Sequence, residues 1–148
     1  MIEVYRSSVI AAPAKRVWAL VRDFNAMPEW NMAISASAIE DGPADRIGCR
    51  RVLIFDDGSI WIHELTALSD ADMSISYKIV GMPEGSAIAI SDYHATIHLI
   101  DITDGGVCAI EWRAQFETDN EAGVRERAGA VFQAGFDGLK RKFASGLR

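Results

Sequence analysis

The sequence predicts an α+β fold in which a seven-stranded antiparallel sheet is covered by one long C-terminal helix. Three observations lead to this prediction: short strand-like segments joined by turn residues, no helical periodicity among the middle segments, and a final segment with one apolar face. A sheet with an apolar face needs a covering layer, and only the final segment is long enough to supply it. We therefore expect a curved sheet wrapped around that helix.

The first part of the chain predicts one strand and two short helices. Residues 2–10 alternate loosely and are rich in β-forming residues, which predicts a strand. Pro13 suits the first turn of a helix, where its missing N–H is no loss. Residues 14–24 place apolar side chains at helical spacing opposite charged ones, which predicts an amphipathic helix. Because Pro28 disfavours helical geometry at the residue before it, only a second short helical turn is expected there.

The middle of the chain predicts six further strands. They are expected at residues 34–39, 49–55, 59–68, 73–80, 91–102 and 107–116. The turn sequences Asp57-Gly58 and Asp104-Gly105-Gly106 are strong signals for tight hairpins. Since no helical pattern separates these strands, an antiparallel meander is expected.

The last segment, residues 121–147, changes to helical periodicity and predicts a long helix with one apolar face. Asn120 can cap its first turn. Gly129, Gly135 and Gly138 are unusual in such a helix, because each costs up to about 1 kcal/mol relative to alanine. Either another segment approaches closely at these glycines, or they leave a cavity open.

Composition limits the classes of protein to which the chain can belong. Its 148 residues favour a single domain, 1–148, with a net charge of −6. The acidic balance argues against nucleic acid as a partner, and no apolar run is long enough to predict membrane insertion. The start of the chain lacks the pattern of a signal peptide, and the two cysteines have no metal or redox spacing. We therefore expect a cytoplasmic protein.

The sequence also carries a series of family motifs. In chain order they are Ala11-Ala12-Pro13-Ala14, Val17-Trp18, Asp23-Phe24, Pro28-Glu29-Trp30, Gly48-Cys49, Arg51, Asp57-Gly58, Leu65, Leu68, Asp70, Ser76-Tyr77, Ser91-Asp92-Tyr93, Trp112, Ala114, Phe116-Glu117, Phe132, Ala134-Gly135-Phe136 and Leu139-Lys140. Together they resemble the polyketide cyclase/dehydrase branch of the START-like superfamily, also called helix-grip or SRPBCC. The resemblance implies a helix-grip fold that encloses a cavity.

The resemblance implies function only broadly, because the superfamily contains aromatic cyclases, lipid carriers and plant hormone receptors. The chain also departs from its relatives at two places. Asn31-Met32 stands where many relatives have His-Pro, and His63-Glu64-Leu65 stands where they often have Glu-Arg-Leu. Both changes alter groups that face the cavity in relatives, so neither a shared ligand nor a shared reaction follows.

Strand alternation assigns the side chains to the two faces of the sheet. In residues 49–55 we expect Val52 and Ile54 to face inward, with Arg50 at the mouth of the cavity. Residues 59–68 leave two choices, and the family match favours the one that places His63 inside. The alternative places Glu64 inside and His63 in solvent.

Aromatic and aliphatic side chains on the expected inner faces are candidates for ligand binding. They are Trp30, Val52, Ile54, Trp61, Ile79, Trp112, Phe116, Val131, Phe132, Gly135 and Phe136. Their density favours a cavity that holds a ligand, although a filled core would use the same residues.

Three polar residues are candidates for chemistry within that cavity. His63 could act as a general acid or base, since an unperturbed histidine titrates at about 6.5. Tyr77 and Tyr93 could orient a ligand carbonyl or stabilise an enolate-like oxygen. In the alternative interpretation, His63 is only a hydrogen-bonded pocket or surface residue. The tyrosines are then ordinary core residues whose hydroxyls bond to the backbone.

The first functional hypothesis is a binding protein for a small hydrophobic molecule that is aromatic, polyketide-like or lipid-like. The alternative is a cofactor-independent polyketide cyclase, aromatase or dehydratase that uses the same cavity. A third hypothesis is a protein-partner module in which the 81–89 loop closes over a ligand. A homodimer through this loop or the C-terminal helix is also considered.

Neither a cofactor nor a metal is expected. His94 and His98 would share one face of a strand but lie about 13 Å apart, which is too far for both to bind one metal ion.

Overall fold

The computed structural model describes residues 1–83 and 90–144. Within them the elements are β1 (Ile2–Ile10), α1 (Ala14–Val21), the 3-10 helix η1 (Met27–Glu29), β2 (Ile34–Ile39), β3 (Arg50–Phe55), β4 (Ile60–Ser69), β5 (Ser74–Gly81), β6 (Ile90–Ile102), β7 (Val107–Thr118) and α2 (Glu121–Ala144). This order confirms the predicted one. The greater part of the 81–89 loop and the predicted end of the last helix lie outside the described residues.

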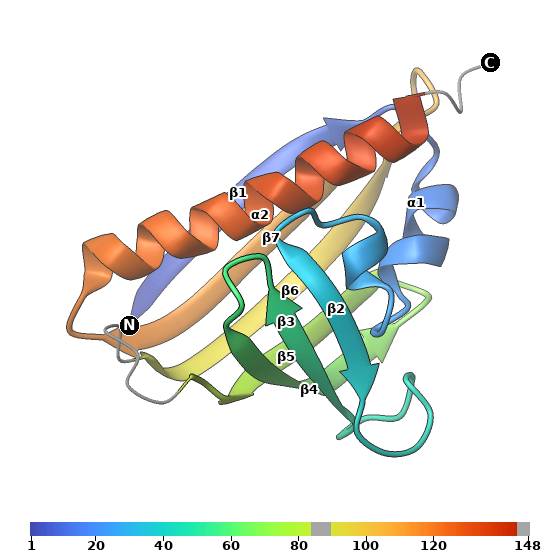
Figure 1. The fold of residues 1–148 in the computed structure, drawn as a ribbon. Helices are drawn as coiled ribbons and strands as arrows, with labels where there is room; N and C mark the ends of the chain where they lie inside the picture. The colour runs from blue at the N-terminus through green and yellow to red at the C-terminus, as the bar shows by residue number, and fades with distance from the viewer. Residues whose placement is uncertain (84–89, 145–148) are drawn as a thin grey trace.

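The described strands form one antiparallel sheet in the order β1-β7-β6-β5-β4-β3-β2. The strands β2 to β7 form a meander, and β1 pairs with β7 as the edge strand of the sheet. In that pairing Ile2 lies opposite Phe116 and Ile10 lies opposite Cys108. Figure 1 shows the sheet curving around α2, which runs along its concave side. The predicted α+β class and the wrapping of the sheet around the long helix are therefore confirmed.

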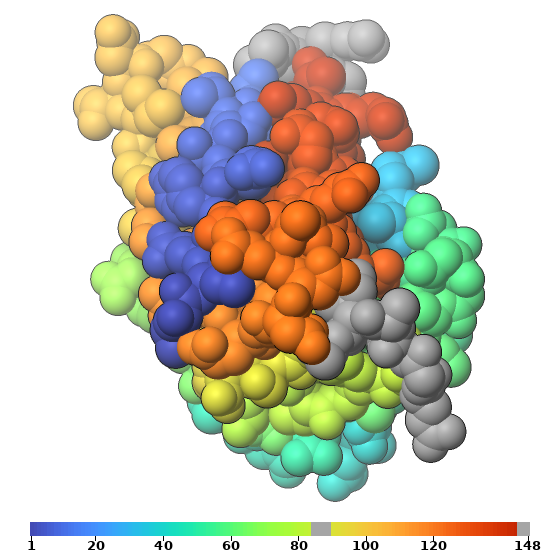
Figure 2. Space-filling view, turned by 90° about the vertical axis from the view of Figure 1, so that its left-hand side faces the viewer, coloured from blue at the N-terminus to red at the C-terminus, as the bar shows by residue number. Residues whose placement is uncertain are grey.

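The first turn of each α-helix is capped by a side chain. The backbone N–H of Ala14 donates to Asp101 of β6 (3.1 Å), which caps the start of α1. The side chain of Asn120 accepts a hydrogen bond from the N–H of Gly123 (3.1 Å), so the predicted cap of α2 is confirmed. Figure 2 shows the orange atoms of α2 packed directly against the blue atoms of β1.

None of the helices within residues 1–83 and 90–144 is long and apolar enough to span a membrane.

The core between the sheet and α2 is centred on Trp112, which is fully buried. Its ring stacks on Phe132 with the ring centroids 4.3 Å apart, and it contacts the rings of Trp30 at 5.8 Å and Phe136 at 6.3 Å. Such aromatic pairs contribute about 0.5–1.5 kcal/mol beyond the area that they bury. This part of the interior is therefore packed solid.

The glycines of α2 are explained by close approach rather than by open space. A Cβ atom on Gly135 would lie 2.8 Å from Cζ3 of Trp30 and 2.9 Å from Cζ3 of Trp112. A Cβ atom on Gly138 would overlap the carbonyl oxygen of Trp30. The assignment of Gly135 to the lining of a ligand cavity is therefore wrong, because two indole rings already fill the space beside it.

The predicted inward face of β3 is also wrong. Ile54 is 39% exposed and Val52 is only partly buried, whereas Arg51 and Leu53 are buried. Arg50, expected at the cavity mouth, pairs with Glu64 on the outer face of the sheet at 3.1 Å.

The cause of this error is the β3–β4 turn. Its hydrogen bonds join Phe55 to Ser59 and leave residues 56–58 in the loop, with Gly58 at a φ of 84°. A two-residue turn at Asp57-Gly58 would place Val52 opposite His63, but the observed register pairs Arg51 with His63. One extra loop residue shifts the register of β3 against β4 by one residue. Every side chain of β3 then lies on the face of the sheet opposite to the predicted one.

Candidate functional site

A small interior cavity lies between α2 and the inner face of the sheet. Its volume is about 50 Å³. It is lined by Phe55, Trp61, His63, Tyr77, Ile79, Ile90, Tyr93, Val124, Arg127, Ala128 and Val131. The wall is mainly apolar and aromatic, with a few polar groups, which is the usual composition of a small-molecule site. Pockets for drug-sized ligands measure about 300–1,000 Å³, so this cavity is far smaller than the volume that such a ligand occupies.

His63 is a deeply buried polar side chain in this wall. It points inward from β4 and is 6% exposed, which confirms its predicted orientation over the alternative with Glu64 inside. Its ring stacks on Tyr77 of β5 with the centroids 4.6 Å apart. Burial and the positive charge of Arg51 hold the pKa of His63 well below 6.5. The imidazole is therefore neutral at pH 7.

Arg51 lies directly behind His63. It is 2% exposed, and its Nη2 lies 3.1 Å from Nδ1 of His63. A guanidinium only donates, so Nδ1 of His63 must accept and the ring proton must sit on Nε2. This hydrogen bond therefore assigns the His63 tautomer.

The remaining contacts of Arg51 are to a carbonyl and to aromatic faces. Its Nη1 donates to the carbonyl of Phe24 at 2.9 Å, and its guanidinium lies 3.9 Å from the Phe24 ring centroid. It also lies 5.0 Å from the ring centroid of Tyr77. Burial lowers the pKa of Arg51 to about 10. Among residues 1–83 and 90–144, no carboxylate forms an ion pair with this cation.

Tyr77 and Tyr93 complete the polar part of the wall. The hydroxyl of Tyr77 accepts a hydrogen bond from Nε1 of Trp112 (3.2 Å) and another from the hydroxyl of Tyr93. Burial raises the pKa of both phenols, so both stay protonated at neutral pH. The two side chains thus join the packed core around Trp112 to the cavity.

An open groove of about 520 Å³ runs along α2 next to the cavity. The two spaces share Phe55, Arg127 and Val131 as walls. Arg127 lies 5.0 Å from the ring centroid of Phe55 and 4.9 Å from that of Trp61, so its side chain stands between the groove and the cavity. The boundary between groove and cavity is therefore made of side chains and not of backbone.

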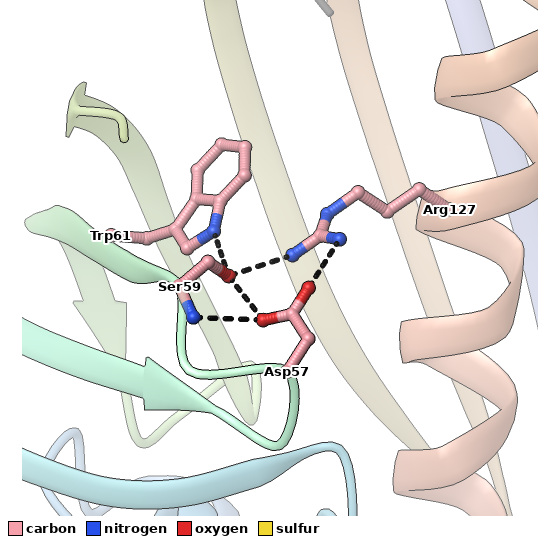
Figure 3. Close-up of polar contacts among 4 residues, drawn as sticks. All are labelled: Asp57, Ser59, Trp61 and Arg127. Carbon is pink, nitrogen blue, oxygen red and sulfur yellow. Dashed lines mark hydrogen bonds and ion pairs between the residues drawn. The ribbon is translucent and has the colours of Figure 1, made fainter. Parts of the chain in front are cut away.

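Arg127 is held in this position by the β3–β4 turn. Its guanidinium donates to Asp57 at 3.4 Å and to Ser59 at 3.5 Å, as Figure 3 shows. Ser59 in turn donates to Asp57 and accepts from Nε1 of Trp61 (3.0 Å). The hydrogen bonds from Ser59, together with the charge of Arg127, lower the pKa of Asp57. These four residues therefore form one hydrogen-bonded group that joins the β3–β4 turn to α2.

The structure brings six of the predicted site residues together around the cavity: Trp61, His63, Tyr77, Ile79, Tyr93 and Val131. Trp30, Trp112, Phe116, Phe132 and Phe136 lie instead in the packed core beside it. A ligand contact by these five stays a prediction. Six residues of the site are not among those predicted from the sequence: Phe55, Ile90, Val124, Arg127 and Ala128 in the wall, and Arg51 behind it. The β3 register would have revealed Phe55 and Arg51, since residues paired across antiparallel strands share a face.

Comparison with protein families identifies the chain. The profile described as "Polyketide cyclase / dehydrase and lipid transport" matches residues 1–144. The chain belongs to this family. The family includes proteins that handle hydrophobic molecules, and the resemblance found in the motifs is confirmed. No curated protein matches the chain by sequence.

Solved structures share the fold of this family member over its whole length. The protein XoxI of Bacillus cereus is 22% identical with a TM-score of 0.88, over 100% of this chain and 99% of its own. A protein of Nitrosospira multiformis is 25% identical with a TM-score of 0.86, over 99% and 100%. A START superfamily protein of Mycobacterium smegmatis is 16% identical with a TM-score of 0.75, over 97% of both chains. The helix-grip assignment is thereby confirmed.

Proposed function

We propose that this chain binds a small hydrophobic molecule, aromatic, polyketide-like or lipid-like, in the interior cavity between the sheet and α2. The observation that carries the proposal is the composition of the cavity wall. Seven of its residues are aliphatic, phenylalanine or tryptophan, and the polar groups of His63, Tyr77 and Tyr93 lie next to one another on the strands. Apolar contact would supply affinity, and the polar groups would orient the ligand.

Entry of such a ligand requires the cavity to enlarge, because about 50 Å³ holds only a few water-sized molecules. The adjoining groove offers the route, since only side chains separate it from the cavity. Arg127 is the polar member of that boundary, and its partners Asp57 and Ser59 lie on an exposed turn. Exposed ion pairs of this kind contribute about 0–1 kcal/mol, and each cation–π contact of Arg127 with Phe55 and Trp61 adds about 0.5–1 kcal/mol, so displacing Arg127 costs only a few kcal/mol.

The geometry favours binding over the alternative of a cyclase or dehydratase. A general base needs a free lone pair that faces the substrate. The lone pair of His63 is on Nδ1, which accepts from Arg51 on the side away from the cavity. His63 is therefore placed to donate a hydrogen bond to a ligand rather than to remove its proton.

Replacing Ala128 with leucine tests the proposed cavity. Ala128 lines it from α2 and is 7% exposed, so the larger side chain would fill the space without changing helix propensity greatly. With the neutral fluorescent probe N-phenyl-1-naphthylamine, we expect micromolar binding to the wild type and at least about tenfold weaker binding to Ala128→Leu.

Ala122→Leu is the matched control, because Ala122 is an exposed residue of the same helix. It should bind the probe like the wild type. Thermal melts of both variants show whether each is folded at the assay temperature. Equal binding by both variants, or no binding by the wild type, would contradict the proposal.

A further inference from the structure

We propose that Arg51 and His63 form a subsite for a carboxylate at the inner side of the cavity, so that the hydrophobic ligand is an organic acid. This inference rests on the proposed function and specifies the class of ligand. Three features of the described residues support it: a buried cation without a counterion, a histidine fixed as a hydrogen-bond donor, and a wall without negative charge.

The first feature is the uncompensated charge of Arg51. Burying a cation is costly unless an anion and a full set of hydrogen bonds offset the loss of water. Arg51 has the Phe24 carbonyl, Nδ1 of His63 and two aromatic faces, but its Nε donor has no partner among the residues that the structure describes. An anion brought close to this guanidinium would supply the missing charge.

The second feature is the direction of the His63 donor. Because Nδ1 accepts from Arg51, the ring proton is on Nε2, on the opposite side of the imidazole from Arg51. His63 lines the cavity and Arg51 does not, so we infer that Nε2 is the nitrogen that a ligand in the cavity would meet. The structure gives Nε2 no partner within residues 1–83 and 90–144. A carboxylate oxygen that accepts from Nε2 would sit in line with the imidazole and the guanidinium, and the donor would be polarised by the positive charge behind it.

The third feature is the charge of the surrounding wall. Its other polar groups beside His63 are the protonated hydroxyls of Tyr77 and Tyr93, which present no negative charge. The remaining ionised side chain of the wall is Arg127, again a cation. The carboxylate of Asp57 lies outside the cavity, on the exposed turn where it binds Arg127. A cavity that has no carboxylate among its lining residues, and an unpaired cation behind His63, complements an acid.

Matched acids and amides test the subsite by isothermal titration calorimetry. The probes are 2-naphthoate against 2-naphthamide, and octanoate against octanamide, so that an aromatic and an aliphatic acid are compared with neutral isosteres. We expect the wild type to bind at least one acid about tenfold or more tightly than its amide, as a charge-assisted hydrogen bond predicts. In Arg51→Met that preference should fall to about twofold or less, while the affinity for the amide changes little.

Two further measurements keep the test independent of how well Arg51→Met folds. His63→Phe keeps a ring to stack on Tyr77 but removes the donor, and it should also abolish the preference for the acid. In the wild type without ligand, long-range ¹H–¹⁵N spectra should show His63 neutral with its proton on Nε2. A proton on Nδ1, or on both nitrogens at pH 7, would overturn the subsite.

The outcomes separate this inference from the proposed function. If acid and amide bind equally well and Ala128→Leu weakens both, the hydrophobic cavity stands and the carboxylate subsite is refuted. If neither member of either pair binds the wild type, and Ala128→Leu has no effect on N-phenyl-1-naphthylamine, both are refuted. An acid preference that survives in both Arg51→Met and His63→Phe would place the anion elsewhere and would also refute the subsite.

Discussion

Gly138→Ala should lower the free energy of unfolding by at least about 3 kcal/mol. The added methyl would overlap the carbonyl oxygen of Trp30, an atom of the backbone that cannot rotate away as a side chain can. Relief requires α2 to move away from η1, and that movement would disturb the aromatic contacts of Trp112 with Trp30 and Phe132. The gain in helix propensity, up to about 1 kcal/mol, is too small to compensate.

Thermal and urea unfolding measure this effect against a matched substitution in the same helix. At Gly129 a Cβ atom would meet only the end of the Arg6 side chain, with Nη2 at 3.1 Å, and that end is free to move. Gly129→Ala should therefore leave stability unchanged or raise it by up to about 1 kcal/mol. For a chain of this length, the loss at Gly138 corresponds to a fall in Tm of roughly 10 °C. An unchanged Tm in Gly138→Ala would contradict the close packing of α2 on η1.

Acidification should destabilise the protein through His63. The folded protein holds the pKa of this residue well below 6.5, whereas in the unfolded chain it is about 6.5. Between these values the unfolded state binds a proton that the folded state does not, so stability falls as the pH drops below about 6.5. At pH 5.5, one pH unit lower, His63 alone should cost about 1.4 kcal/mol, while at pH 7.5 its effect is close to zero.

Urea unfolding at pH 7.5 and pH 5.5 isolates this contribution. Other groups also titrate in this range, so the quantity of interest is the difference between the wild type and His63→Gln. The variant should lose about 1.4 kcal/mol less than the wild type on acidification. His94→Gln is the control, because His94 is exposed on the outer face of β6, and it should lose as much as the wild type. An equal loss in His63→Gln and wild type would show that protonation of His63 is not opposed in the folded protein.

Local signals in the sequence were enough to predict the order of elements and the class of fold. Hydrophobic periodicity distinguishes strands from helices because it reflects the geometry of a single segment. The cap at Asn120 and the helical turn at Pro28 are equally local, and both predictions hold. Alternation with the family match also placed Trp61 and His63 on the inner face of β4.

The face of β3 could not be decided from its own residues. Each of its two alternating sets contains large apolar side chains and one arginine, Arg50 in one set and Arg51 in the other, so neither set is marked as the solvent side. The true face depends on the number of residues in the β3–β4 loop, which sets the register with β4. Arg51 was consequently missed as a neighbour of His63, and with it the reason why His63 is a donor.

The sequence by itself determined which segments form the sheet and which helix covers it, because these choices follow from periodicity within each segment. Only the tertiary structure decided whether the glycines of α2 leave space or are filled. Gly135 and Gly138 meet Trp30, far away in the sequence, so no local pattern records the contact. The interior cavity likewise lies beside His63 and Ala128 and not beside those glycines, because its volume is what remains after side chains from five separate elements have packed.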